Sequence, residues 1–141
     1  MSDRLPLDQR FILQAHRYAN EWGTCPRAKV GAIVVLDGQQ VAYGYNGAPP
    51  KMPHCTAVGC IIKNGHCIRA IHAESNALWF AGQERTQGAT LYATHFPCWE
   101  CCKLIVRADI RRVVYDIEYR VDDEAMQMLR LAGLDVRRVE K

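Results

Sequence analysis

Four side chains of this sequence have the types and the spacing of a metal site that performs hydrolysis. His72 is followed two residues later by Glu74, and Pro97 precedes the pair Cys98 and Cys101. One imidazole and two thiolates provide three ligands for zinc, which leaves the fourth tetrahedral position open for water. An open position distinguishes a catalytic zinc from a structural one, and Glu74 is suited to carry protons beside that water.

These residue types predict hydrolytic removal of an amine from an amidine-like carbon. Zinc lowers the pKa of a coordinated water, so hydroxide is available near neutral pH. We expect hydroxide to attack the carbon that bears the exocyclic amine, while Glu74 moves the water proton to the ring nitrogen and helps ammonia leave. A lone C-x-x-C is often half of a structural zinc site, but its combination with H-x-E and a preceding proline favours catalysis.

The elements that must position these residues follow from the apolar pattern. Helical spacing predicts helices, which cover 7–22, 72–81, 98–108 and 122–132. Apolar, β-branched runs predict strands, which cover 30–36, 41–45, 90–94, 112–115 and 135–139. The first two strands flank the turn Asp37-Gly38 and should form a hairpin. Helices separate the later strands, which should therefore run parallel in an α/β sandwich of about five strands.

Both halves of the metal site lie at predicted helix starts. A C-x-x-C at a helix start places both sulfurs on one face, and the helix dipole stabilises thiolates there. Because His72 begins another helix, we expect the zinc between two helix N-termini at one edge of the sheet.

The composition limits the classes of function. The chain has 141 residues, of which 49% are hydrophobic, so we expect one domain over 1–141. A net charge of only +3 argues against a dedicated duplex-DNA binder. Neither a membrane span nor the apolar region of a signal peptide is found, which favours a cytoplasmic location. The seven cysteines are then expected to be metal-binding thiolates more than disulfides.

Beyond the metal motif, the sequence resembles the deoxycytidylate (dCMP) deaminase family from about Thr24 to Gly133. The zinc motif is shared by cytidine, guanine, riboflavin-pathway, tRNA and polynucleotide deaminases. Two further segments favour the nucleotide-monophosphate branch, namely Cys25-Pro26-Arg27 and Gly44-Tyr45-Asn46-Gly47. The resemblance implies a three-layer α/β/α cytidine-deaminase-like sandwich with a mixed sheet. It also implies conversion of dCMP to dUMP, a precursor for thymidylate.

The resemblance also implies substrate contacts. Asn46 and Asn76 would contact the sugar and neighbouring polar groups, and the Ala73 backbone N–H would meet the pyrimidine carbonyl. Candidates for the phosphate are Arg27, Lys29 and the Tyr119-Arg120 region. In the alternative interpretation, Arg27 and Lys29 are solvent-exposed charges at the start of a strand, and Asn46 is a turn residue beside Gly47.

Several residues near the motif keep two interpretations. Cys102 points about 100° further round the helix than Cys101, so we expect a small buried residue and not a ligand. His95 is either a substrate contact or a hydrogen-bonded residue at a strand end. Phe96 and Trp99 form either an aromatic wall against the base or part of the core.

The long segment 46–71 has no clear period and is rich in cysteine, histidine and proline. We expect a second, structural zinc to staple it, with four thiolate ligands: Cys25, Cys55, Cys60 and Cys67. His54 or His66 could replace one of them. The resemblance permits this site, and the alternative is a set of scattered buried thiols.

The residues of the motif are also compatible with other functions. The substrate could be free cytidine, a modified cytosine nucleotide or an RNA base, and the chain could instead be a non-catalytic zinc module. The resemblance implies a homo-oligomer, with activation by dCTP and inhibition by dTTP in some members. An effector site of that kind could lie near the segment Gly44–Gly47.

Overall fold

A five-stranded mixed sheet forms the centre of the protein. The computed structural model describes residues 3–24, 29–63, 66–118 and 121–141. The strand order is β2-β1-β5-β6-β7. The strands are β1 (Gly31–Leu36), β2 (Gln39–Tyr45), β5 (Thr90–His95), β6 (Arg112–Ile117) and β7 (Asp135–Arg138). β1 runs antiparallel to β2 and β5, whereas β5, β6 and β7 are parallel, so the predicted hairpin and parallel strands are confirmed.

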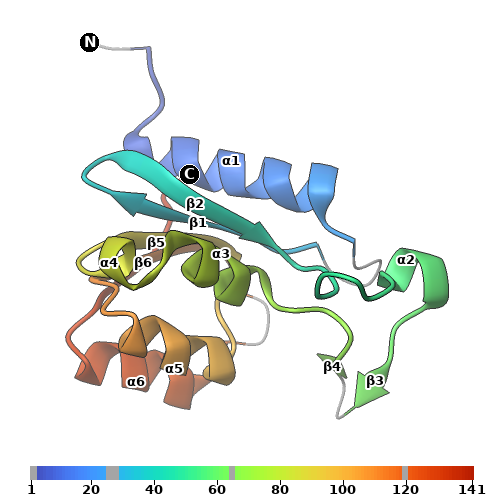
Figure 1. The fold of residues 1–141 in the computed structure, drawn as a ribbon. Helices are drawn as coiled ribbons and strands as arrows, with labels where there is room; N and C mark the ends of the chain where they lie inside the picture. The colour runs from blue at the N-terminus through green and yellow to red at the C-terminus, as the bar shows by residue number, and fades with distance from the viewer. Residues whose placement is uncertain (1–2, 25–28, 64–65, 119–120) are drawn as a thin grey trace.

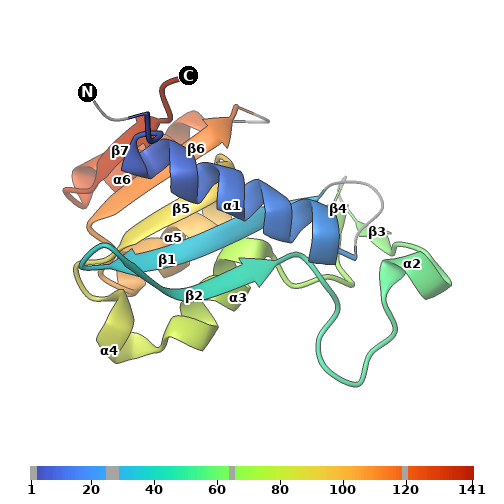
Figure 2. The ribbon, with the colours of Figure 1, turned by 90° about the horizontal axis from the view of Figure 1, so that it is seen from above.

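Helices cover both faces of this sheet. Helix α1 (Leu7–Trp22) lies across one face, and Figures 1 and 2 show it over β1 and β5. The other face carries α3 (Ala73–Ala81), α5 (Trp99–Arg107) and α6 (Asp123–Leu131), with the short α4 (Gln83–Thr86) after α3 (Figure 1). The predicted three-layer α/β/α sandwich is therefore confirmed.

Alternation along the strands divides the apolar core in two. Leu91 and Val113 belong to the larger cluster, which packs against α3, α5 and α6. Tyr92 and Val114 belong to the cluster under α1. Neighbouring strand residues point to opposite faces, so a continuous apolar run supplies both clusters.

The segment between β2 and α3 is less irregular than its sequence suggests. It contains α2 (Cys55–Val58) and a two-stranded sheet of β3 (Ile62–Lys63) and β4 (His66–Cys67). We call residues 48–70 the lobe, since this part extends beside the sandwich in Figure 1. Its two ends are bridged: Gly47 N–H donates to Ile71 O at 3.2 Å, and Ile71 N–H donates to Gly47 O at 2.8 Å.

Element boundaries differ slightly from the prediction. β2 begins at Gln39 and β6 continues to Ile117. Cys98 and Asp122 are N-cap residues and not the first residues of their helices. Among the described residues, no helix is long and apolar enough to cross a membrane.

Candidate metal and active site

The structure brings together three predicted metal ligands from two distant parts of the chain. His72 Nδ1 lies 3.4 Å from Cys98 Sγ and 3.3 Å from Cys101 Sγ. The ligand atoms of all three residues lie within 4.8 Å of one another. We call them the histidine–cysteine cluster. His72 is the N-cap of α3 and Cys98 the N-cap of α5, so the cluster lies between two helix N-termini, as the spacing predicted.

Hydrogen bonds within the cluster shift the pKa values of its two thiols in opposite directions. The hydrogen bond from Cys101, followed by that from His72, lowers the pKa of Cys98 to about 4, although burial opposes the shift. The same pairing, together with burial, raises the pKa of Cys101. The hydrogen bond to Cys98 raises the pKa of His72 to about 9. Cys98 is therefore a thiolate at neutral pH, the form in which cysteine binds a metal.

Glu74 is a buried carboxylate beside this cluster. The residue is 4% exposed, and its Oε1 has no hydrogen-bond partner within the described residues. Burial raises the pKa of Glu74, and the nearby His72 partly opposes that shift. A buried carboxylate oxygen without a partner is costly unless a cation or a water compensates it. One imidazole, two thiols and such a carboxylate fit a zinc ion with an open coordination position.

Two asparagines brace the end of β2 against α3 and β1. Asn46 is 6% exposed, and its Oδ1 accepts the Val30 N–H at 3.1 Å. Asn76 on α3 donates its Nδ2–H to Tyr45 O at 2.9 Å. Both amides thus have local structural bonds at the positions for which the resemblance implies substrate contacts.

Gly44 lets β2 approach the first turn of α3. A Cβ atom at this position would lie 2.2 Å from Ala73 O and 2.6 Å from Ala77 N, both backbone atoms. Ala73 is fully buried at the start of α3. In the sequence, Gly44 stands out only as part of the motif Gly44-Tyr45-Asn46-Gly47. A glycine inside a strand, which often marks a close backbone approach, was the available signal.

A cavity of about 590 Å³ opens beside this junction. Its walls come from β2, the lobe and α3, and include Tyr45, Gly47, Met52, Ile71 and Asn76. This volume lies within the range of small-molecule sites.

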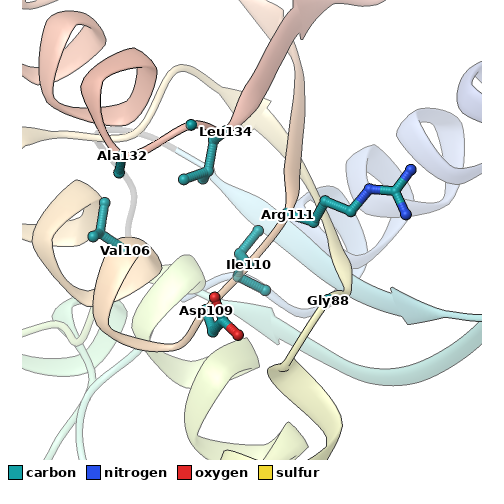
Figure 3. Close-up of a pocket in the computed structure, with 8 residues that line it drawn as sticks. Gly88, Val106, Asp109, Ile110, Arg111, Ala132 and Leu134 are labelled. Carbon is teal, nitrogen blue, oxygen red and sulfur yellow. The ribbon is translucent and has the colours of Figure 1, made fainter.

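Another cavity, of about 340 Å³, lies at the amino ends of β6 and β7 (Figure 3). Figure 3 shows Val106, Ile110 and Leu134 grouped around it, whereas Arg111 extends away from them. It lies at the opposite end of the sheet from the histidine–cysteine cluster, because Cys98 follows the carboxyl end of β5.

Three thiols of the lobe form a second cluster. Cys55, Cys60 and Cys67 have their sulfurs within 4.8 Å of one another, and those of Cys55 and Cys67 are 3.5 Å apart. We call them the lobe cysteines. Burial, followed by the hydrogen bond with Cys67, raises the pKa of Cys55 to about 12. Burial also acts to raise the pKa of Cys67, but hydrogen bonds from backbone groups and from Cys55 together lower it to about 7. Cys25, the fourth predicted ligand, lies outside the described residues. His54 is exposed and lines the larger cavity.

The predicted phosphate contacts lie mostly outside the described part of the chain. This holds for Arg27, Tyr119 and Arg120. Lys29 belongs to the part of the chain that the structure describes. It lies on the surface, where its Nζ donates to Gly23 O at 3.0 Å.

The structure places Cys102 and Phe96 in the core. Cys102 is fully buried and donates its S–H to Pro97 O at 3.6 Å, as expected of a core residue. Phe96 is 5% exposed and packs edge-to-face on Tyr115, so it belongs to the core, whereas Trp99 is 38% exposed. His95 Nδ1 lies 2.7 Å from Thr94 Oγ1.

Known proteins resemble this chain over most of its length. ComE operon protein 2 of Bacillus subtilis (strain 168) is 40% identical over 140 residues, covering 98% of this chain and 74% of that protein. Deoxycytidylate deaminase of Saccharomyces cerevisiae is 39% identical over 134 residues. These cover 90% of this chain but only 43% of the yeast protein.

A solved structure has the same fold. The crystal structure of dCMP deaminase from the cyanophage S-TIM5, in complex with dCMP and dUMP, aligns with a TM-score of 0.82 and 30% identity. The alignment covers 98% of this chain and 100% of that one. The sequence model described as "Cytidine and deoxycytidylate deaminase zinc-binding region" matches residues 6–117. The chain therefore belongs to the cytidine and deoxycytidylate deaminase family.

Proposed function

We propose that the protein is a zinc-dependent hydrolase that deaminates dCMP to dUMP and releases ammonia. The observation that carries this proposal is the buried Glu74 carboxylate beside the histidine–cysteine cluster. The names of the yeast and cyanophage relatives supply the substrate. The product of this reaction, dUMP, is a precursor for the synthesis of thymidylate.

The roles of the residues follow from their chemistry. His72, Cys98 and Cys101 hold the zinc, which when bound supplies a Lewis acid that makes water nucleophilic near neutral pH. Glu74 accepts the proton that the attacking water loses and delivers it to the ring nitrogen. It then takes the remaining proton of the added hydroxyl, which becomes the carbonyl, and passes it to the amine, which leaves as ammonia. Its burial favours the protonated carboxyl that these deliveries require.

Substrate contacts come from the junction of β2 and α3. The Ala73 N–H at the start of α3 donates to the pyrimidine carbonyl, since helix N-termini carry unpaired N–H groups. Asn46 and Asn76 face the sugar, with their local hydrogen bonds fixing their orientation. Lys29, together with Arg27 and Tyr119, binds the phosphate.

The test of the proposal is a Glu74→Gln variant assayed with dCMP. The amide has nearly the same shape but cannot titrate, so we expect unchanged zinc content and a loss of roughly 10²- to 10⁴-fold in kcat. Cytidine, deoxycytidine and dCTP are measured beside dCMP by ultraviolet absorbance. Equal activity on cytidine would contradict a phosphate site. A fully active Glu74→Gln protein would contradict the mechanism.

A second zinc ion on the lobe cysteines is part of the proposal. Cys55, Cys60 and Cys67 supply three ligands, and Cys25 supplies the fourth. The lobe needs such a staple, because Cys55 is its only buried residue among those described. Replacing Cys55 and Cys60 together with serine should lower the zinc content from two ions to one per chain. Cys102→Ser is the matched control, and an unchanged content in the double variant would refute the site.

The remaining properties concern the whole protein. We propose a cytoplasmic homo-oligomer of one deaminase domain, 1–141, with dCTP as activator and dTTP as inhibitor. The proposed effector site lies near Gly44–Gly47, on the lobe side of the larger cavity. Light scattering with each nucleotide measures the oligomer. A dCMP rate that neither dCTP nor dTTP changes would refute the regulation.

A further inference from the structure

Ser75 is a partly buried residue beside the histidine–cysteine cluster, and its hydroxyl has no role in the proposed reaction. It lies in the first turn of α3, one residue after Glu74 and three residues after His72. Its Oγ lies 3.8 Å from Cys101 Sγ on α5, within hydrogen-bonding range of a sulfur atom. The side chain therefore connects the two helices whose N-termini carry the metal ligands.

The contact with Cys101 differs from the bond that a serine inside a helix usually makes. Such a hydroxyl commonly donates to a carbonyl oxygen of the preceding turn. Within the described residues, however, Cys101 Sγ is the only hydrogen-bond partner of the Ser75 side chain. The hydroxyl is thus directed toward a metal ligand and away from its own helix.

The direction of this hydrogen bond follows from the chemistry of the ligand. Cys101 must be a thiolate to bind a metal, and a thiolate can only accept. Ser75 therefore donates its O–H to the sulfur when the site is loaded. Cys101 is 1% exposed, so water has little access to replace that donor.

The charges at the site give the donor a function. Two thiolates and an ionised Glu74 carry three negative charges, which exceed the two positive charges of a zinc ion. Glu74 and Cys101 are both buried, so the excess charge is poorly solvated. A hydroxyl dipole directed at one sulfur offsets part of it. Hydrogen bonds to metal ligands also fix the orientation of those ligands.

We propose that Ser75 is a positioning residue that orients the Cys101 thiolate toward the metal and offsets part of its charge. This inference rests on the proposed zinc-dependent function and deepens it. Asn76, the next residue, lines the larger cavity, whereas Ser75 is not among the residues that line it. Ser75 therefore acts on the reaction only through Cys101 and makes no contact with the nucleotide.

The first experiment is ¹¹³Cd spectroscopy of the protein loaded with cadmium in place of zinc. The resonance of bound cadmium depends on its ligands, so the histidine–cysteine cluster and the lobe cysteines should give separate signals. Ser75→Ala removes the hydroxyl and should move the cluster signal while leaving any lobe signal in place. Ser75→Thr keeps a hydroxyl and is the matched control, with a cluster signal close to that of wild type. A cluster signal that Ser75→Ala leaves unmoved would overturn the proposal.

Chelator competition on the same samples measures the affinity for the metal. In Ser75→Ala, EGTA should remove the cluster signal at about a tenth of the concentration that wild type requires, because loss of such a partner commonly weakens metal binding by at least about tenfold. Ser75→Thr should behave as wild type. Alanine has the highest helix propensity, so a folding defect in α3 is not expected. Equal affinity in Ser75→Ala and wild type would contradict the role of the hydroxyl.

Steady-state kinetics separate a positioning role from a substrate contact. Zinc-loaded Ser75→Ala should lose about three- to tenfold in kcat for dCMP, the effect of one neutral hydrogen bond, with KM unchanged. A raised KM with unchanged kcat would overturn the positioning role, since it would identify a contact with the substrate. Wild-type protein that holds zinc yet leaves dCMP unchanged would refute the proposed function, and the cadmium experiments would still decide the role of Ser75.

Discussion

Replacing Gly44 with alanine should move the catalytic helix. The new Cβ would lie 2.2 Å from Ala73 O and 2.6 Å from Ala77 N, whereas ordinary contact begins at 3.4 Å. Both atoms are backbone, so no side chain can rotate away, and β2 and α3 must separate by roughly 1 Å. Such overpacking costs about 1–3 kcal/mol of unfolding free energy. Since Glu74 lies in the displaced turn, a shift of about 1 Å should also lower kcat/KM by on the order of 10²-fold.

Gly38→Ala is the matched control for this experiment. Gly38 has a φ of +77° and no atom within 4 Å of an added Cβ, so alanine there is strained but displaces nothing. It should lose about 1 kcal/mol of stability and keep wild-type kcat/KM. Urea unfolding gives the stabilities, and the dCMP assay on zinc-loaded protein gives the rates. A Gly44→Ala protein with wild-type stability and kcat/KM would refute the close approach of β2 to α3.

Three further variants test other parts of the fold. The Arg112 guanidinium donates hydrogen bonds that hold the pKa of Asp8 below its usual value. This pair therefore stabilises the fold fully above about pH 4 and less as the pH falls through the lowered folded-state pKa. Asp8→Asn should cost about 1–3 kcal/mol at pH 7, and urea unfolding at graded pH should show the difference from wild type shrinking below pH 4. A difference independent of pH would contradict the ion pair. Leu129 is fully buried and Leu131 is 82% exposed, so Leu129→Ala should cost about 2–5 kcal/mol and Leu131→Ala less than about 0.5. Equal costs would contradict the placement of α6. Asp122 caps α6 by accepting the N–H groups of residues 124 and 125, so Asp122→Ala should cost about 1 kcal/mol in the same assay, and no loss would refute the cap.

The periodic parts of the sequence were sufficient to predict the sandwich. The helix over 7–22 and the strands that form the centre of the sheet have strong apolar patterns, because each buries at least one face. Strands separated by helices had to run parallel, and β5, β6 and β7 do so. The lobe was not predictable in this way, since its short elements are too small to have a period and bury little apolar surface.

The metal centre was predictable for a different reason. His72 and Cys98 both begin helices, and a helix start gives each side chain a defined position relative to the sheet. The sequence could signal a close backbone approach at Gly44, but not which atoms lie against this glycine. Its partner atoms are backbone atoms of a helix 29 or more residues away, so only the tertiary arrangement reveals the contact. The hydrogen bond between Thr94 and His95 was equally hidden, because neighbouring residues in a strand usually point to opposite faces.

Because Gly47 and Ile71 are hydrogen-bonded to each other, the number of residues in the lobe between them can change without moving the sheet. Both hydrogen bonds lie where the lobe joins the sandwich, so residues 48–70 leave and rejoin the sandwich at one point. The entropy of closing such a loop grows only slowly with its length. Insertions and deletions between these two residues should therefore leave the sandwich intact. The lobe is thus the part of this architecture in which a deaminase can most readily change its pocket walls while keeping its reaction centre.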